Sequence, residues 1–176
     1  MSELDDFLDK DLIRKKLINA SLYLMAYELL KISIVDGVRD FFISGINAEG
    51  FIYADEYKNR VLPRANHVFE ASLFFLVEVG AITEGEMAQI QELREYRNKL
   101  AHGIPTTVYE SERTFDAGKL ELAGYFLNKI DNFWGRVEVD TDPDVDRNGI
   151  DYDGITSVRS AIFQYIARIV TDELDI

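Results

Sequence analysis

Three side chains that can act on phosphate esters fall within six residues of one apolar-periodic segment. Arg97 lies four residues after Leu93 and three before Leu100, so it shares the apolar stripe of the helix expected there. Asn98 and His102 are four apart, which puts them on one face of that helix. A histidine can serve as general acid or base near neutral pH, and a guanidinium can stabilise a phosphorane-like transition state. The trio therefore suits RNA cleavage without a metal.

The position of His102 gives a second expectation. Gly103 and Pro105 follow it and predict the end of the helix, which would place His102 in the last turn. The partial negative charge of a helix C-terminus would raise the pKa of His102. Because one histidine does not readily serve as both acid and base, a symmetric dimer would supply the second.

An alternative interpretation makes the same residues structural. An arginine on an apolar stripe needs an anionic partner, for which Glu70 and Glu78 are candidates, and a histidine before a stop glycine can be a simple cap. Tyr96, Tyr109 and Arg113 could line a nucleotide-sized pocket near the motif or belong to a core or interface.

The segment Arg97-Asn98-Lys99-Leu100-Ala101-His102 resembles the signature of the HEPN superfamily. That resemblance implies a homodimeric helical bundle and a metal-independent endoribonuclease of toxin–antitoxin or phage-defence systems, with catalytic Arg97, Asn98 and His102. Its partners would be RNA and a cognate antitoxin or regulatory protein. Ile104 stands where some toxins of the superfamily carry a tyrosine.

A second likeness supports a non-catalytic function. Residues 80–103 resemble the corresponding helix of mannitol-operon-repressor-type regulators, which implies a binding module that acts through protein or nucleotide partners. Three interpretations stay open: an endoribonuclease, a regulatory module, and an unrelated helical protein in which Arg97 is simply ion-paired.

The elements that would position these residues are helical. Five segments predict them. The first has the apolar stripe Ile18, Leu22, Met25, Leu29 and Ile32, with a possible kink at Asp36-Gly37, and the second runs from Pro63 to Gly80. A Thr83/Glu86 capping box precedes the third, with Met87, Ile90, Leu93 and Leu100; the fourth has Leu120, Ala123, Leu127, Ile130 and Trp134, and the fifth, after Thr156, has Val158, Ile162, Tyr165 and Ile169. Residues 46–55 are expected to be a connector, and 139–154 one long acidic loop. We therefore predict a single all-α domain over 1–176, a bundle of four or five helices without strands.

Composition narrows the function classes further. The net charge of −13 is carried entirely by residues 1–11, 138–153 and the last five residues, and the rest of the chain is neutral. A neutral body weakens the case for a long nucleic-acid groove and leaves room for a small basic site. The absence of cysteine excludes disulfides and thiolate chemistry.

No metal site, cofactor or membrane segment is expected. Asp144, Asp146, Asn148 and Gly149 match the start of a calcium loop, but Ile155 stands where the bidentate glutamate should be, so a solvated acidic turn is favoured. His67 is expected to be structural or exposed. The acidic start of the chain lacks the pattern of a secretory signal, which predicts a cytoplasmic protein.

Overall fold

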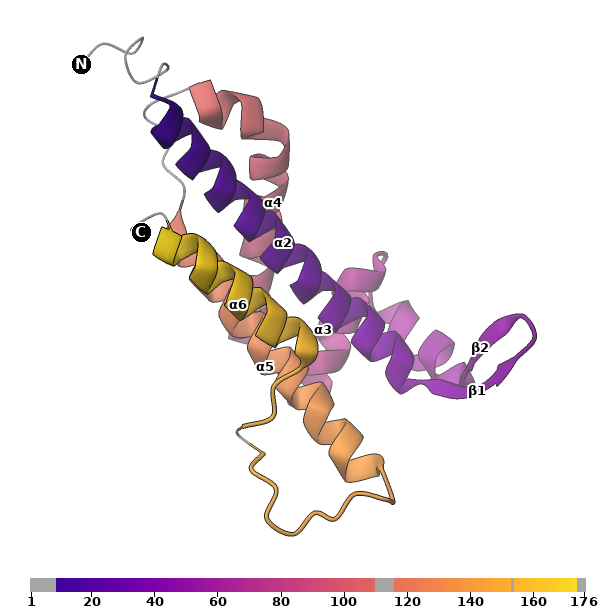
Figure 1. The fold of residues 1–176 in the computed structure, drawn as a ribbon. Helices are drawn as coiled ribbons and strands as arrows, with labels where there is room; N and C mark the ends of the chain where they lie inside the picture. The colour runs from indigo at the N-terminus through magenta and orange to yellow at the C-terminus, as the bar shows by residue number, and fades with distance from the viewer. Residues whose placement is uncertain (1–8, 110–115, 153, 174–176) are drawn as a thin grey trace.

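The computed structural model describes residues 9–109, 116–152 and 154–173. They form a mostly helical assembly with one small sheet, as Figure 1 shows. The elements are α2 (Lys10–Phe41), β1 (Ile43–Asn47), β2 (Gly50–Tyr53), a π-helical turn (Tyr57–Val61), a 3-10 turn (Leu62–Arg64), α3 (Val68–Glu78), α4 (Glu84–Tyr109), α5 (Ala117–Thr141) and α6 (Val158–Glu173). The expected helical class is therefore present.

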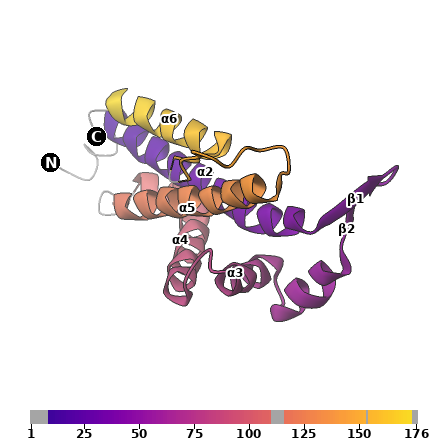
Figure 2. The same cartoon turned by 90° about the horizontal axis from the view of Figure 1, so that it is seen from below.

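Helix α2 is the central element, and α3, α4, α5 and α6 all pack on it. Asp9 caps its start by accepting the amides of Asp11 and Leu12 at 3.0 and 3.1 Å. In the view of Figure 2, α6 and α5 lie on one side of the molecule and α3 and α4 extend to the other. This arrangement places α4, which carries the candidate residues, directly against α2.

The buried face of α2 differs from the stripe that the sequence suggested. Of that stripe only Leu22 is buried, whereas Ile32 is 38% exposed. The core face is the opposite one: Ala20, Tyr23, Ala26, Tyr27, Leu30, Ile34 and Val38. Helix α2 is apolar on two faces, so periodicity alone selected the wrong one.

Helix α2 runs without a break through Asp36-Gly37, where the sequence suggested a possible kink. Gly37 instead allows a close approach. A Cβ built there would lie 2.2 Å from the indole nitrogen of Trp134, which donates to the carbonyl of Ser33 at 2.9 Å.

The expected connector at 46–55 is wrong for most of its length. Strands β1 and β2 form an antiparallel hairpin that projects from the end of α2 (Figure 1). Its side chains Ile46, Phe51 and Ile52 are exposed. Both faces of the hairpin carry apolar residues, so it lacks the alternation by which a half-buried strand is recognised.

The second expected helix begins later than Pro63. Pro63 lies in the 3-10 turn, and α3 starts only after His67, whose backbone is extended and whose side chain is exposed without a capping bond. His67 is thus an exposed residue at a helix start, in line with its expected structural or surface role.

The capping box before α4 is confirmed. The amide of Glu86 donates to the Thr83 hydroxyl at 3.2 Å, and the amide of Thr83 donates to the Glu86 carboxylate at 2.8 Å. Ile90, Leu93 and Leu100 are buried, as their spacing predicted.

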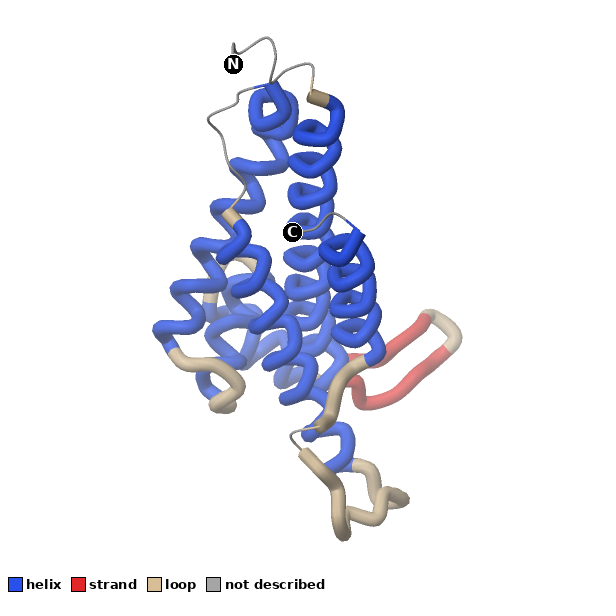
Figure 3. The backbone as a smooth tube through the Cα atoms, turned by 60° about the vertical axis from the view of Figure 1, so that its left-hand side comes forward, coloured by secondary structure: helices blue, strands red, loops and turns tan. Residues whose placement is uncertain are grey.

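The last two helices lie in the segments where the sequence predicts them. Ala123, Leu127 and Ile130 of α5 are buried, although α5 continues to Thr141 and so shortens the acidic loop. Helix α6 begins two residues after Thr156, but Val158, Ile162 and Tyr165 of its expected stripe are exposed, and Phe163 is buried instead. The side chain of Ile169, the fourth residue of that stripe, lies outside the described set. In Figure 3, α6 lies along the outside of the helical body.

The sequence analysis predicted no membrane segment. By length and composition alone, however, α2 is apolar enough to cross a membrane. This is weak evidence, since buried central helices pass the same test, and α2 is the helix on which the others pack.

Candidate functional site

Arg97 is held against α2 by a single carboxylate. Its Nε and Nη2 atoms donate to Oε1 of Glu28 at 3.1 and 2.7 Å, and Nη1 lies 3.4 Å from the amide oxygen of Asn98. The Arg97 side chain keeps 34% of its surface exposed. The guanidinium is therefore fixed in direction and still accessible from solvent.

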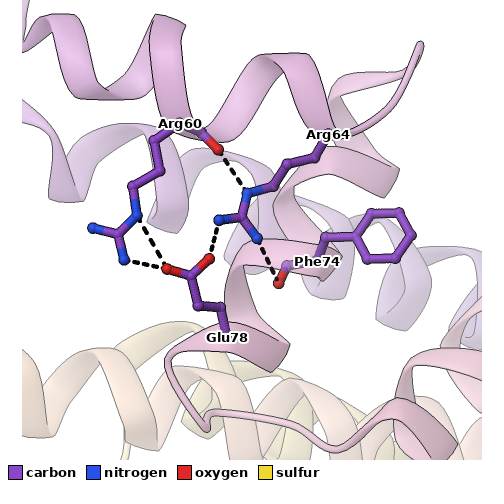
Figure 4. Close-up of polar contacts among 4 residues, drawn as sticks. All are labelled: Arg60, Arg64, Phe74 and Glu78. Carbon is purple, nitrogen blue, oxygen red and sulfur yellow. Dashed lines mark hydrogen bonds and ion pairs between the residues drawn. The ribbon is translucent and has the colours of Figure 1, made fainter.

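The partner of Arg97 is neither of the two that the sequence suggested. Glu78 binds Arg60 and Arg64 at the far end of α3, and Figure 4 shows both guanidinium groups around its carboxylate. Arg64 also donates from Nε to the carbonyl of Arg60 at 2.6 Å, within the turns before α3, and from Nη1 to the carbonyl of Phe74 at 3.4 Å, which ties these turns to that helix. Glu78 is thus engaged in a different contact.

Glu28 is the residue that the sequence analysis missed. It is a carboxylate in the middle of an apolar helix, and its second oxygen accepts from Lys31 at 3.3 Å. Glu28 therefore joins Arg97 and Lys31 in one small polar group. The interruption of the apolar run at position 28 was the available signal.

Asn98 and His102 are both exposed and lie four residues apart on α4. Their expected common face is consistent with an unbroken helix through this stretch. Arg97, Asn98 and His102 consequently belong to one continuous stretch of α4 whose polar side chains reach solvent.

The expected helix stop at Gly103 and Pro105 is wrong, because α4 continues to Tyr109. Pro105 has no amide to give the carbonyl of Ala101, so α4 lacks one hydrogen bond there, although it stays helical to Tyr109. The C-terminus lies roughly two turns beyond His102. His102 is therefore not in the last turn of the helix, and the effect expected from a helix C-terminus does not apply to it.

Behind Arg97 lies a layer of packed tyrosines. The rings of Tyr23 and Tyr96 meet edge to face at 4.8 Å, and the Tyr23 hydroxyl donates to the carbonyl of Leu93 at 2.7 Å. The Tyr96 hydroxyl accepts the amide of Asp116 at 3.1 Å and so fixes the start of α5. Burial raises the pKa of Tyr27 to about 12 and that of Tyr23 further. Tyr96 thus serves packing rather than a pocket.

Three further residues singled out in the sequence have no described side chains. Arg113 lies outside the described residues, and Ile104 and Tyr109 belong to the part of α4 whose side chains are outside the described set.

A separate acidic cavity of about 830 Å³ lies between α2, α5 and the loop before α6. Asp131 is its buried carboxylate and accepts hydrogen bonds from the hydroxyls of Ser33, Ser157 and Ser160 and a weaker one from Arg159. These contacts satisfy Asp131 and attach the start of α6 to α2 and α5. Its chemistry is that of a structural carboxylate.

The segment that matches the start of a calcium loop forms hydrogen bonds within itself. Oδ1 of Asp146 accepts from the amide and the side chain of Asn148 at 3.0 and 2.9 Å. Within the described ranges, no three histidine or carboxylate side chains are grouped so that they could hold a metal ion.

Comparison with known protein families, with curated proteins and with solved structures finds no match to this chain. The HEPN likeness therefore depends on residues 97–102 and on the helical architecture around them.

Proposed function

We propose that the chain is a metal-independent endoribonuclease of the HEPN type that acts as a homodimer in a toxin–antitoxin or phage-defence setting. The observation that carries this proposal is the orientation and solvent exposure of the Arg97 side chain. Its guanidinium is oriented by Glu28 and Asn98, its side chain is one-third exposed, and an exposed histidine follows five residues later on the same helix. An oriented, accessible arginine and an exposed histidine are the two kinds of group that phosphate-ester cleavage needs.

In this mechanism His102 takes the proton of a ribose 2′-hydroxyl, and the 2′-oxygen attacks the adjacent phosphorus. Arg97 stabilises the extra negative charge on the phosphorane-like transition state, and the Asn98 amide can donate to a phosphate oxygen. The bond to the 5′-oxygen breaks, and a protonated His102 from a second copy supplies its proton. The products are a 2′,3′-cyclic phosphate and a 5′-hydroxyl.

Glu28 has a positioning role in the proposal. Both of its contacts with Arg97 go to one oxygen, so they fix the plane of the guanidinium and leave Nη1 directed toward Asn98. A Glu28→Gln variant should keep part of the hydrogen bonding and lose the charge that holds Arg97 in place.

The test is cleavage of total RNA and tRNA in EDTA by the wild type, His102→Ala and Arg97→Ala. We expect a loss of at least about a hundredfold in both variants, because general acid–base catalysis by one group, and stabilisation of transition-state charge by one donor, each contribute roughly that factor or more. Lys99→Ala is the matched control, since Lys99 is an exposed cation between them on α4.

All variants should melt like the parent for the comparison to be valid. Cyclic-phosphate ends in the wild type, lost in both variants and kept in Lys99→Ala, would support the mechanism. RNA left intact by the wild type, or cleavage that survives His102→Ala, would contradict it.

The second candidate is a non-catalytic regulatory or binding module. Exposed apolar side chains on the β1–β2 hairpin, Ile46, Phe51 and Ile52, favour it, because such patches are typical of protein contacts. This candidate gains weight if a folded wild type leaves all RNA intact.

A further inference from the structure

Within the described ranges, Arg94 of α4 makes no hydrogen bond and no ion pair. Its guanidinium lies over the ring of Phe69 in the first turn of α3, 5.5 Å from the ring centroid. By contrast, Arg60, Arg64 and Arg97 each bind a carboxylate. The contact with Phe69 holds the Arg94 guanidinium in place and leaves its N–H groups available to an anion.

A buried hydroxyl lies close to this arginine. Tyr27 of α2 is 3% exposed, and its ring centroid lies 6.4 Å from that of Phe69. The Tyr27 hydroxyl makes no hydrogen bond to any residue that the structure describes. Burial raises the pKa of Tyr27, and the charges of Arg94 and Arg97 act in the opposite direction, so both guanidinium groups are near the hydroxyl. A buried donor without an acceptor favours a ligand that supplies one.

Arg94 and Arg97 are neighbours where α2, α3 and α4 contact one another, on the side of the molecule that Figure 2 shows away from α6. Residues three apart on a helix have Cβ atoms ~5–6 Å apart, a separation that two neighbouring phosphates of one nucleic-acid strand can bridge. Glu28, which binds Arg97, also binds Lys31. Three cations thus surround one carboxylate in a chain whose body is otherwise neutral, which favours an anion with more than one charge.

We infer that Arg94 and Tyr27 bind the phosphate next to the scissile one, so that the RNA strand is held at two consecutive phosphates. The Arg94 guanidinium donates to the oxygens of this second phosphate, and the Tyr27 hydroxyl gives it a further hydrogen bond. Both side chains position the substrate and transfer no proton. The inference rests on the proposed function, because that function assigns the scissile phosphate to Arg97.

A two-phosphate site defines the substrate class. A dinucleotide with a single phosphate occupies only the position at Arg97, whereas a strand with one more phosphate also occupies the position at Arg94. Charge-assisted hydrogen bonds to phosphate are strong, so the second phosphate should tighten binding by about tenfold or more. Phosphate contacts carry no sequence information, and the gain should therefore be the same for different bases.

The test is an NMR titration with dinucleotides that cannot be cleaved, because a 2′-O-methyl group replaces the attacking hydroxyl. The ligands are 2′-O-methyl ApA and the same dinucleotide with an added 5′-phosphate or 3′-phosphate. For the wild type we expect one of the two added phosphates to lower the dissociation constant by about tenfold or more. Arg94→Gln should abolish this gain and leave the affinity for unphosphorylated ApA unchanged.

Two further variants separate a phosphate contact from a general effect on the fold. Tyr27→Phe removes only a hydroxyl that bonds to no described residue, so it should fold like the parent and lose part of the gain. Lys99→Ala is the matched control and should keep the whole gain. Lys99 is an exposed cation five residues after Arg94, at about 140° around the same helix.

The outcomes for binding and for cleavage are independent. Equal affinity of the wild type for all three ligands, no binding of any of them, or a gain that survives Arg94→Gln would overturn the inference. A gain that depends on Arg94 in a protein that leaves RNA intact would support the two-phosphate site and contradict only the reaction. Cleavage of RNA without such a gain would contradict only the site.

Discussion

Gly37 of α2 lies against Trp134 of α5, whose indole fills the space that a side chain at position 37 would need. We expect Gly37→Ala to destabilise the fold by about 1–3 kcal/mol, since the new methyl group overlaps Trp134. Urea unfolding followed by tryptophan fluorescence would measure the change.

Gly85→Ala is the control for that substitution, because the nearest heavy atom to its Cβ position is 3.9 Å away. This second helical glycine should be neutral or gain up to about 1 kcal/mol on replacement by alanine. Equal effects at the two positions would contradict the close-packing explanation for Gly37.

The buried tyrosines behind Arg97 predict alkaline sensitivity. Burial raises the pKa of Tyr27 to about 12 from 10.0, so the unfolded chain loses this proton first. Stability is therefore complete below pH 10 and falls as the pH rises from about 10 toward 12, by about 1 kcal/mol per pH unit from Tyr27.

Unfolding by urea at pH 9 and pH 11 would measure this effect. Tyr27→Phe should reduce the loss, and Tyr165→Phe, which removes an exposed hydroxyl, should leave it unchanged. An identical pH dependence in wild type and Tyr27→Phe would rule out Tyr27 as its source.

At the scale of the elements, Asp131 determines where α6 begins. Three hydroxyls from α2 and from the first turn of α6 donate to this carboxylate, which is 5% exposed. Asp131→Ala should cost roughly 2–4 kcal/mol, because it leaves buried donors without acceptors. Hydrogen exchange should accelerate in the first turns of α6 and stay unchanged in α3.

Glu92→Ala is the comparison for Asp131→Ala. Glu92 pairs with Lys119 at 3.1 Å, but its side chain is 64% exposed, so its loss should cost less than about 1 kcal/mol. Uniform acceleration of exchange over the whole chain after Asp131→Ala would show that the network does not act locally on α6.

The whole molecule carries a charge of −13, concentrated at its ends and in one loop. Repulsion among these acids opposes the compact state, and salt screens it. We expect the melting temperature to rise by a few degrees between about 20 and 500 mM NaCl, measured at low protein concentration. KCl at equal ionic strength should give the same shift, and a fall in both salts would contradict the charge argument.

Local chemistry made several features of this protein predictable from its sequence. The capping box of Thr83 and Glu86, the buried face of α5 and the start of α6 each depend on residues within one or two turns, and the structure contains them. The shared face of Asn98 and His102 was predictable as well, because residues four apart on a continuous helix lie on the same side of it.

Tertiary packing decided the rest. The sequence shows that α2 and α6 are apolar on more than one side, but which side is buried depends on which helices pack there. The choice of Glu28 as the partner of Arg97 depends on α2 crossing α4, a contact between residues 69 apart. The hairpin and the continuation of α4 past Pro105 also depart from the local signals in the sequence. Packing decides which face of a central helix is buried, because local propensities amount to about 1 kcal/mol or less per ordinary residue while the contacts of a buried face sum to more.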